Sequence, residues 1–484
     1  MQIARTALSA VLAVSLAACG GSNSGSSGSG GGGGGATPTP SPTPAPSSAT
    51  CSLRDRQDWA LSVLQDTYLY PNLIDSGINP DSFATVQDYI DALLAPARAQ
   101  GRDRFFTYIT SIEEENALIE SGASAGFGIR LSYDTSARRL FVLEAFESAP
   151  AFAAGIDRGT EIVGIGTSQA NIEDVSAIFA RGGAFAVSQA LGPSDPGVSR
   201  VLRISDGAGT RTVTVRKQDF QLDPISDRYG VVILNDGGKR VGYLNFRTFF
   251  PQNADAQLRA AFAEFKSAGV DELVVDFRYN GGGLLYLATV LSDLLGEGLA
   301  GQTQLRVAYN PSRSSENVTV EFQDEPNAIR PERIAFITSE ATASASEAVI
   351  ASLLPYYDDG DIALIGSDTA GKAIGQEAYD REECDDRLRV IAFQLENADG
   401  QGDYFNGIGS IVPVTCRAAD DISEQLGDED EASIAKALDY LAGRGTCTPV
   451  AGGQGASALQ SGRQTLRPDR NERSAAQYEI PGLF

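Results

Sequence analysis

Residues 272–295 read ELVVDFRYNGGGLLYLATVLSDLL, and this stretch indicates the architecture of the chain around it. It begins as a buried strand over residues 272–277, turns at three glycines, and continues as a helix over 284–295. Further strands are predicted over residues 241–246, 333–338 and 362–366, and further helices over 253–267 and 344–354. This alternation predicts an α/β layer in which helices connect parallel strands.

Sites in sheets of this kind form beyond the carboxyl ends of the strands. Two segments are predicted to lie there, the turn that begins at Asn280 and the polar segment 339–346. Gly281 and Gly282 lie in the turn, where residues without a side chain can present backbone N–H groups at close range. Glycines alone are also typical of a flexible loop, so the turn needs support from other residues.

The chain contains no histidine, so it cannot form a Ser-His-Asp triad, and a serine nucleophile needs another base. Ser344 begins a predicted helix and, with Glu347, fits a capping box, which is the simpler interpretation of these two residues alone. A serine at a helix start also lies near backbone N–H groups, and the N–H of Ala345 can point at an oxyanion.

Lys372 is the candidate base. Residues 366–372 also fit G-x-x-x-x-G-K, but Ala373 stands where a phosphate-binding loop needs Ser or Thr, which disfavours a nucleotide site. A lysine with a pKa of about 10.4 is only ~0.04% neutral at pH 7, so a lysine base needs burial to lower its pKa to about 7–8. Gln376 can hold the amine without adding charge.

Composition and the first residues indicate export. The formal net charge of −25 disfavours nucleic-acid binding. Arg5 and an apolar run predict a signal peptide over residues 1–18. Leu-Ala-Ala-Cys at residues 16–19 resembles a bacterial lipobox, which implies lipidation of Cys19 and a periplasm-facing anchor, with the outer membrane favoured. A plain signal peptide is the alternative. Residues 19–50, rich in Gly, Ser and Pro, predict a tether.

Four further cysteines predict two disulfides, since an even number is typical of exported chains. They are Cys51, Cys384, Cys416 and Cys447. We favour Cys384–Cys416, which are near in sequence, and Cys51–Cys447, which would close the ends of the folded body. Because the chain lacks histidine and any Cys-x-x-Cys spacing, we expect no zinc site, and we expect no cofactor.

The regions that flank the α/β layer predict separate units. Residues 51–118 carry apolar helical stripes and predict a helical cap. Residues 119–218 are rich in short strands, and residues 219–448 hold the α/β layer. Residues 449–484 are polar and predict a disordered tail, although it ends in the apolar sequence Ile-Pro-Gly-Leu-Phe.

Within residues 119–218, the loop Gly126-Phe127-Gly128-Ile129 and the glycine-rich segment 149–166 resemble a PDZ domain. The resemblance implies a groove in which a peptide C-terminus adds as a β-strand while backbone N–H groups bind its carboxylate. A small β domain without a ligand is the alternative. We also hypothesise that the apolar residues 480–484 could occupy such a groove.

Residues 276–283, 342–347 and 371–376 occur together and in this order, and they look like the carboxyl-terminal processing, or tail-specific, proteases of peptidase family S41. The resemblance implies a ClpP/crotonase-like α/β catalytic domain with a Ser-Lys dyad. Position by position, it makes Ser344 the nucleophile, Lys372 the general base and Gln376 its orienting partner. It also implies an oxyanion hole formed by Gly281 or Gly282 and the N–H of Ala345.

The resemblance implies a serine endopeptidase that cleaves unfolded or C-terminally exposed proteins in the cell envelope. One alternative is a non-catalytic S41-fold protein that binds peptides or apolar ligands, as the retinoid-binding proteins of the eye do. Another is a scaffold that only docks C-termini through the PDZ-like groove. Ser344, Lys372 and Gln376 argue against the first alternative, because a binding protein needs none of them, and replacing Lys372 by alanine would distinguish the scaffold from a protease.

Overall fold

The computed structural model describes residues 51–450 and 462–484. The predicted signal peptide, the lipidation site Cys19 and the tether lie outside these residues. Across the two described ranges, no helix has the length and apolar character needed to cross a membrane.

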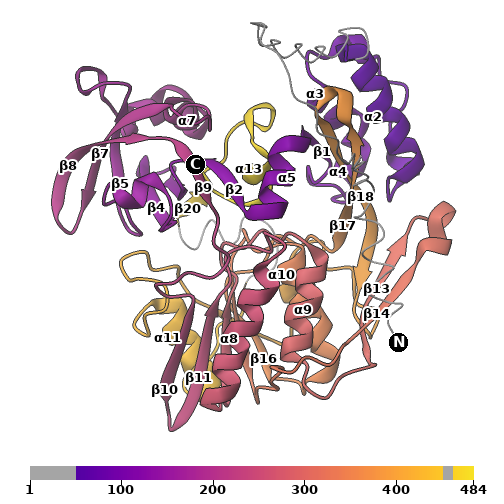
Figure 1. The fold of residues 1–484 in the computed structure, drawn as a ribbon, viewed down its shortest axis with the longest axis vertical. Helices are drawn as coiled ribbons and strands as arrows, with labels where there is room; N and C mark the ends of the chain where they lie inside the picture. The colour runs from indigo at the N-terminus through magenta and orange to yellow at the C-terminus, as the bar shows by residue number, and fades with distance from the viewer. Residues whose placement is uncertain (1–50, 451–461) are drawn as a thin grey trace, which may run out of the picture.

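The central layer is a six-stranded sheet in the lower half of Figure 1. Its strands, in spatial order, are β10 (Val231–Asp236), β11 (Lys239–Asn245), β12 (Glu272–Asp276), β15 (Ile334–Thr338), β16 (Ile362–Gly366) and β19 (Val414–Arg417). All neighbours are parallel except β10 and β11. Strands β12, β15 and β16 are buried along their whole length, as expected for parallel strands covered on both faces. The predicted α/β layer is therefore confirmed.

Helices cover both faces of this sheet. On one face lie α8 (Ala254–Ala268), α9 (Leu285–Leu295) and α10 (Ala345–Leu353), which share one apolar core with the sheet. On the other face α11 (Ala432–Leu441) packs through Ile434 and Leu438. Every residue of α10 is buried, so the start of this helix lies deep inside the molecule.

A second sheet lies beside the first and packs against the N-terminal helices. It contains β1 (Tyr108–Ser111), β18 (Asp386–Glu396), β13 (Thr303–Tyr309) and β14 (Val318–Glu321), with β17 (Ile374–Arg381) also paired to β18. The helices are α2 (Leu53–Thr67), α3 (Val86–Leu93) and α4 (Ala95–Ala99). Leu64 and Ile90 from these helices share a core with Leu388 and Ile391 of β18, so the predicted helical cap is continuous with this sheet.

Residues 123–221 form a further unit, which we call the β unit and which lies at the upper left of Figure 1. Its main sheet contains β3 (Ile129–Asp134), β4 (Arg139–Ala145), β5 (Glu161–Gly166), β6 (Glu173–Asp174), β7 (Ser199–Asp206) and β8 (Gly209–Arg216). Helices α6 (Pro150–Ala153) and α7 (Val175–Leu191) pack on it. Strands β2 (Ala123–Gly126) and β9 (Gln218–Gln221) pair with each other at its base, and α5 (Ile112–Ser121) precedes them.

The prediction of a disordered tail is wrong for residues 462–484, which we call the tail. Strand β20 (Arg463–Thr465) pairs with β3. Helix α13 (Ala475–Glu479) lies between the β unit and the N-terminal helices in Figure 1. The few apolar side chains of the tail, among them Leu466, Ile480 and Leu483, are all buried. The composition of the tail is mostly polar, which is why it predicted disorder. The few apolar residues pack on surfaces formed by distant parts of the chain, and composition does not contain that information.

Both favoured disulfide pairings are also wrong. The structure pairs Cys51 with Cys384 and Cys416 with Cys447, with Cα–Cα distances of 5.5 and 4.5 Å. Cys51 precedes α2, which packs on β18 just after Cys384. Cys447 follows α11 where the chain returns beside β19, so that the N–H of Arg417 donates to the carbonyl of Thr448 at 2.7 Å. The cysteines pair according to which segments pack together in the fold, and distance along the chain does not predict this.

Candidate active site

Three adjacent parallel strands carry the candidate catalytic segments to one edge of the central sheet. Strand β12 leads into the turn that contains Asn280, β15 leads to Ser344, and β16 leads to Lys372. These strands are neighbours in the order β12-β15-β16, so their carboxyl ends lie side by side. The sequence motifs that lie far apart along the chain are thus brought to one place.

Ser344 begins α10 in a strained backbone conformation, with φ 55° and ψ −114°. Non-glycine residues seldom adopt positive φ, and such strain collects at functional sites. The N–H of Ser344 donates to Glu347 Oε2 at 2.8 Å, which is the capping contact expected from the sequence. The N–H of Ala343 donates to the carbonyl of Asn280 at 3.1 Å. An ordinary helix cap needs no positive φ, so the strain indicates a further role.

Glu347 is the site residue whose main role the sequence did not indicate. Besides Ser344, its carboxylate accepts the N–H of Lys372 at 2.8 Å, the N–H of Gly371 at 2.7 Å and the hydroxyl of Thr369. Burial raises the pKa of Glu347. The carboxyl group therefore connects the backbone of Ser344 with that of Lys372. A single acidic residue in a helix that is otherwise uncharged was the signal that could have marked it.

Lys372 is buried, with 6% of its surface exposed. Its Nζ donates to Gln376 Oε1 at 2.5 Å, and Gln376 Nε2 donates to the carbonyl of Phe106 at 2.6 Å. The second bond orients the amide so that its oxygen faces the lysine. Burial lowers the pKa of Lys372, and the negative charges of Glu479 and Glu347 oppose this shift. The net lowering favours the neutral amine that a general base requires.

The three candidate oxyanion donors differ in availability. The N–H of Gly282 already donates to Asn280 Oδ1 at 2.9 Å, and Asn280 is held in turn by its Nδ2 on the carbonyl of Phe246 at 2.8 Å. The N–H groups of Gly281 and Ala345 have no hydrogen-bond acceptor among residues 51–450 and 462–484. The geometry thus favours Gly281 over Gly282 as the partner of Ala345.

Ser344 and Lys372 do not hydrogen-bond through their side chains within the described part of the chain. The lysine amine donates to Gln376 instead. In many enzymes such a hydrogen bond forms only when substrate is bound.

A cavity of about 570 Å³ lies in front of the lysine. Loops at the edge of the central sheet contribute Gly281, Ala343 and Lys372 to its wall, and the tail contributes Tyr478, Glu479 and Pro481. The candidate site is therefore covered on one side by the chain's own tail.

The predicted peptide-binding residues Gly126, Phe127, Gly128 and Ile129 form the entry to β3. The N–H groups of Gly128 and Ile129 donate to the carbonyl oxygen of Phe484 at 2.9 and 3.3 Å, and the N–H of Phe484 donates back to Ile129 at 2.9 Å. A Cβ at Gly126 would lie 2.9 Å from the carbonyl carbon of Phe484, so a glycine permits this close approach. This edge of the β unit therefore accepts an extended chain.

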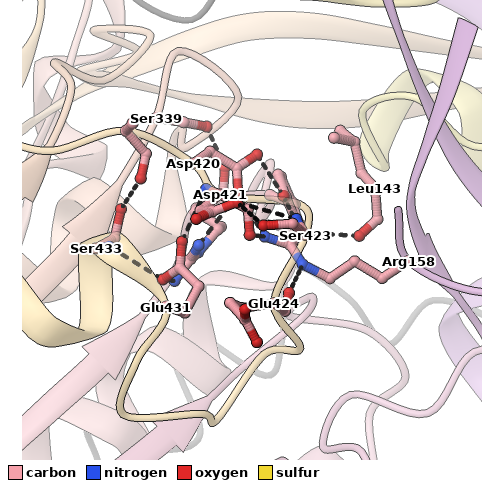
Figure 2. A network of polar contacts seen from close by, with 12 residues as sticks. Leu143, Arg158, Ser339, Asp420, Asp421, Ser423, Glu424, Glu431 and Ser433 are labelled. Atoms are coloured by element: carbon pink, nitrogen blue, oxygen red, sulfur yellow. Dashed lines mark hydrogen bonds and ion pairs between the residues drawn. The ribbon is translucent and has the colours of Figure 1, made fainter. Parts of the chain in front are cut away.

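A buried polar network joins the β unit to the candidate site, and Figure 2 shows Arg158 reaching across to the loop of Asp420 and Glu424. Arg158 donates to Asp420 at 2.7 Å and to the hydroxyl of Tyr279 at 2.6 Å. Burial opposes ionisation of Asp420, but Arg158 and Arg278 together hold its pKa well below the usual value. Because Arg278 and Tyr279 directly precede Asn280, this network fixes the end of β12 and the turn that begins at Asn280.

Parts of the chain are similar to known proteins. Residues 240–410 match the model of peptidase family S41. The chain is 26% identical over 263 residues to a carboxyl-terminal-processing protease of Picosynechococcus sp., covering 54% of this chain and 57% of that protein. It is 25% identical over 338 residues to a chloroplastic carboxyl-terminal-processing peptidase 3 of Arabidopsis thaliana, covering 69% and 62%. The match thus spans less than two thirds of either relative.

Among solved structures, a candidate S41 protease from Bacteroides fragilis superposes with a TM-score of 0.60 at 24% identity. The match covers 80% of this chain and 97% of that protein, and it shows a common fold. The fold is therefore that of a mixed α/β, multidomain protein, and its residues 240–410 are similar to the S41 peptidases. More particularly, its curated relatives are carboxyl-terminal processing proteases from bacteria and chloroplasts.

Proposed function

We propose that this protein is a serine endopeptidase of the carboxyl-terminal processing type, with Ser344 as nucleophile and Lys372 as general base. The observation that carries the proposal is the buried carboxylate of Glu347, which holds the backbone N–H groups of both residues at 2.8 Å. Gln376 fixes the lysine amine at the same time. A non-catalytic binding protein needs neither the strained serine nor the buried lysine.

The proposed reaction follows from these positions. Neutral Lys372 takes the proton of the Ser344 hydroxyl as Oγ attacks the carbonyl carbon of the scissile peptide bond. The N–H groups of Gly281 and Ala345 stabilise the oxyanion. The intermediate collapses, the C–N bond breaks, and Lys372 gives its proton to the leaving amine. Lys372 then takes a proton from a water molecule as the water oxygen attacks the acyl carbonyl, and it returns that proton to Ser344 Oγ when the ester bond breaks and the acid product leaves.

The proposed substrates are proteins that present an extended C-terminal segment. We assign the β unit as a PDZ-like domain whose edge at Gly128 and Ile129 binds such a segment by strand addition. The backbone pairing with Phe484 supports this assignment, since it has the pattern that an added peptide would make. Attachment through Cys19 to a bacterial membrane, facing the periplasm, is the proposed location.

Replacing Ser344 by alanine tests the proposal. We expect S344A to lose cleavage of an unfolded protein substrate while it still binds that substrate. The control is S352A, because Ser352 lies on the same helix but its hydroxyl contacts Ser292 and Val349, away from the site. Cleavage by purified S344A at the wild-type rate would disprove the role of Ser344.

A further inference from the structure

We propose that residues 474–484, which we call the inhibitory segment, are a built-in ligand of the peptide channel. By this channel we mean the edge of β3 together with the cavity in front of Lys372. These residues occupy the edge of β3 and the space against Gly281, beside the cavity in front of Lys372, so a substrate must displace them. The inhibitory effect rests on the proposed peptidase function, whereas occupancy of the channel does not.

One end of the segment is held as an added strand. The N–H of Leu131 donates to the carbonyl of Gly482 at 2.9 Å, and Leu483 forms an antiparallel bridge with Arg130. Together with the bonds of Phe484 described above, these contacts extend the sheet of the β unit by three residues. The side chain of Phe484 lies in the apolar core of that unit. A substrate could not pair with β3 while this strand is present, because both need the same N–H and carbonyl groups.

The other end of the segment lies against the candidate oxyanion turn. The ring of Tyr478 stacks on that of Tyr108 at 3.9 Å between centroids, and the hydroxyl of Tyr108 donates to the carboxylate of Glu479. A Cβ at Gly281 would collide with the carbonyl oxygen of Glu479 and would lie 2.9 Å from Pro481. The segment thus fills the space that a substrate backbone would need beside Gly281.

Charge acts in the same direction as position. The carboxylate of Glu479 opposes the effect of burial and raises the pKa of Lys372. Because a protonated amine cannot accept the proton of Ser344, the bound segment disfavours the active form of the base. Removal of the segment frees the channel and also removes this charge.

Non-covalent contacts hold the segment within the described residues, so exchange with a competing peptide is feasible. A competitor would mimic its chemistry, with a large apolar residue in the position of Phe484 and extended backbone from Gly482 onward. Such a peptide must outcompete a ligand present on the same chain, whose effective concentration is on the order of millimolar.

Peptide binding tests the occupancy without any need for catalysis. The probe is a fluorescent peptide SAAQYEIPGLF, the sequence of residues 474–484. It is titrated against S344A protein that stops at Arg473 and against full-length S344A protein. We expect the full-length protein to bind the probe at least about tenfold more weakly. Equal affinity for the two proteins would overturn the proposal.

A point variant of the full-length protein tests the same proposal even where the shortened chain misfolds. F484D in the full-length protein places a charge in the apolar pocket and should release the segment, while E472Q alters an exposed position of the same tail. With Ser344 intact, we expect F484D to raise kcat/KM for an unfolded substrate at least fivefold and E472Q to leave it unchanged. An unaltered rate in folded F484D contradicts inhibition. If no variant cleaves the substrate but the shortened protein still binds the probe peptide more tightly, the peptidase function is refuted. The conclusion that the segment occupies the channel then stands.

Discussion

Replacing Glu347 by glutamine tests the contact on which the candidate site depends. One carboxylate oxygen accepts the N–H groups of Ser344 and Lys372, each at 2.8 Å. The other accepts the N–H of Gly371 at 2.7 Å and the hydroxyl of Thr369. Glutamine offers one oxygen only, so its NH₂ group must face one of these two pairs of donors.

The magnitude follows from counting the donors that lose an acceptor. In the better orientation the NH₂ group faces Gly371 and Thr369, because the hydroxyl of Thr369 can rotate and accept. The N–H of Gly371 is then buried without a partner, which costs about 1–3 kcal/mol, and the remaining bonds lose the help of the negative charge. We expect the free energy of unfolding to fall by about 2–4 kcal/mol.

Activity should fall further than stability alone requires. Ser344 and Lys372 take their positions from the same carboxylate, and small displacements of reacting groups cost about 10²-fold in rate. The measurements are urea unfolding and kcat/KM for an unfolded protein substrate. E297Q makes the same chemical change at an exposed glutamate paired with Lys266, and it should shift stability by no more than about 0.5 kcal/mol. Wild-type stability and activity in E347Q would refute the reasoning.

Three further predictions concern charged groups. In Q376E a carboxylate beside Lys372 should raise the lysine pKa, so that the pH profile of kcat/KM shifts to higher pH; an unshifted profile would contradict the role of Gln376. Burial lowers the pKa of Lys217 to about 7. The unfolded chain therefore binds more protons above that pH, and stability measured by urea unfolding should rise by up to about 1.4 kcal/mol per unit between pH 7 and 10. K217M should have a flatter profile, and equal slopes would refute this. R158A removes a buried arginine that pairs with the partly exposed Asp420 and should lower the free energy of unfolding by about 3 kcal/mol, and a loss below 1 kcal/mol would contradict it.

The architecture of the central layer could be predicted because its signals are local. The buried strand at residues 272–276 and the helix at 285–295 carry their own periodicity. The strand ends then bring Asn280, Ser344 and Lys372 together, since parallel neighbouring strands end at the same edge. The strand ends alone placed Asn280 and Ser344, whereas the place of Lys372 was taken from the family resemblance.

The features that the sequence did not predict depend on contacts between segments that lie far apart along the chain. Cys51 and Cys384 pair across 333 residues because α2 packs on β18. The capping role of Glu347 was local and predictable, whereas its bond to Lys372 joins helix α10 to the loop that follows β16. The fold of the tail likewise depends on β3 and on α5, which lie more than 300 residues earlier.

The buried arginines of the β unit have a consequence for how the molecule unfolds. Arg130 donates to the carbonyls of Tyr279 and Arg247, and Arg158 donates to the loop at Asp420. Melting of either unit alone would break all of these hydrogen bonds at once, so each unit stabilises the other. No unit is then free to melt ahead of the others. We expect calorimetry to record one cooperative transition, in which the β unit and the central sheet unfold together.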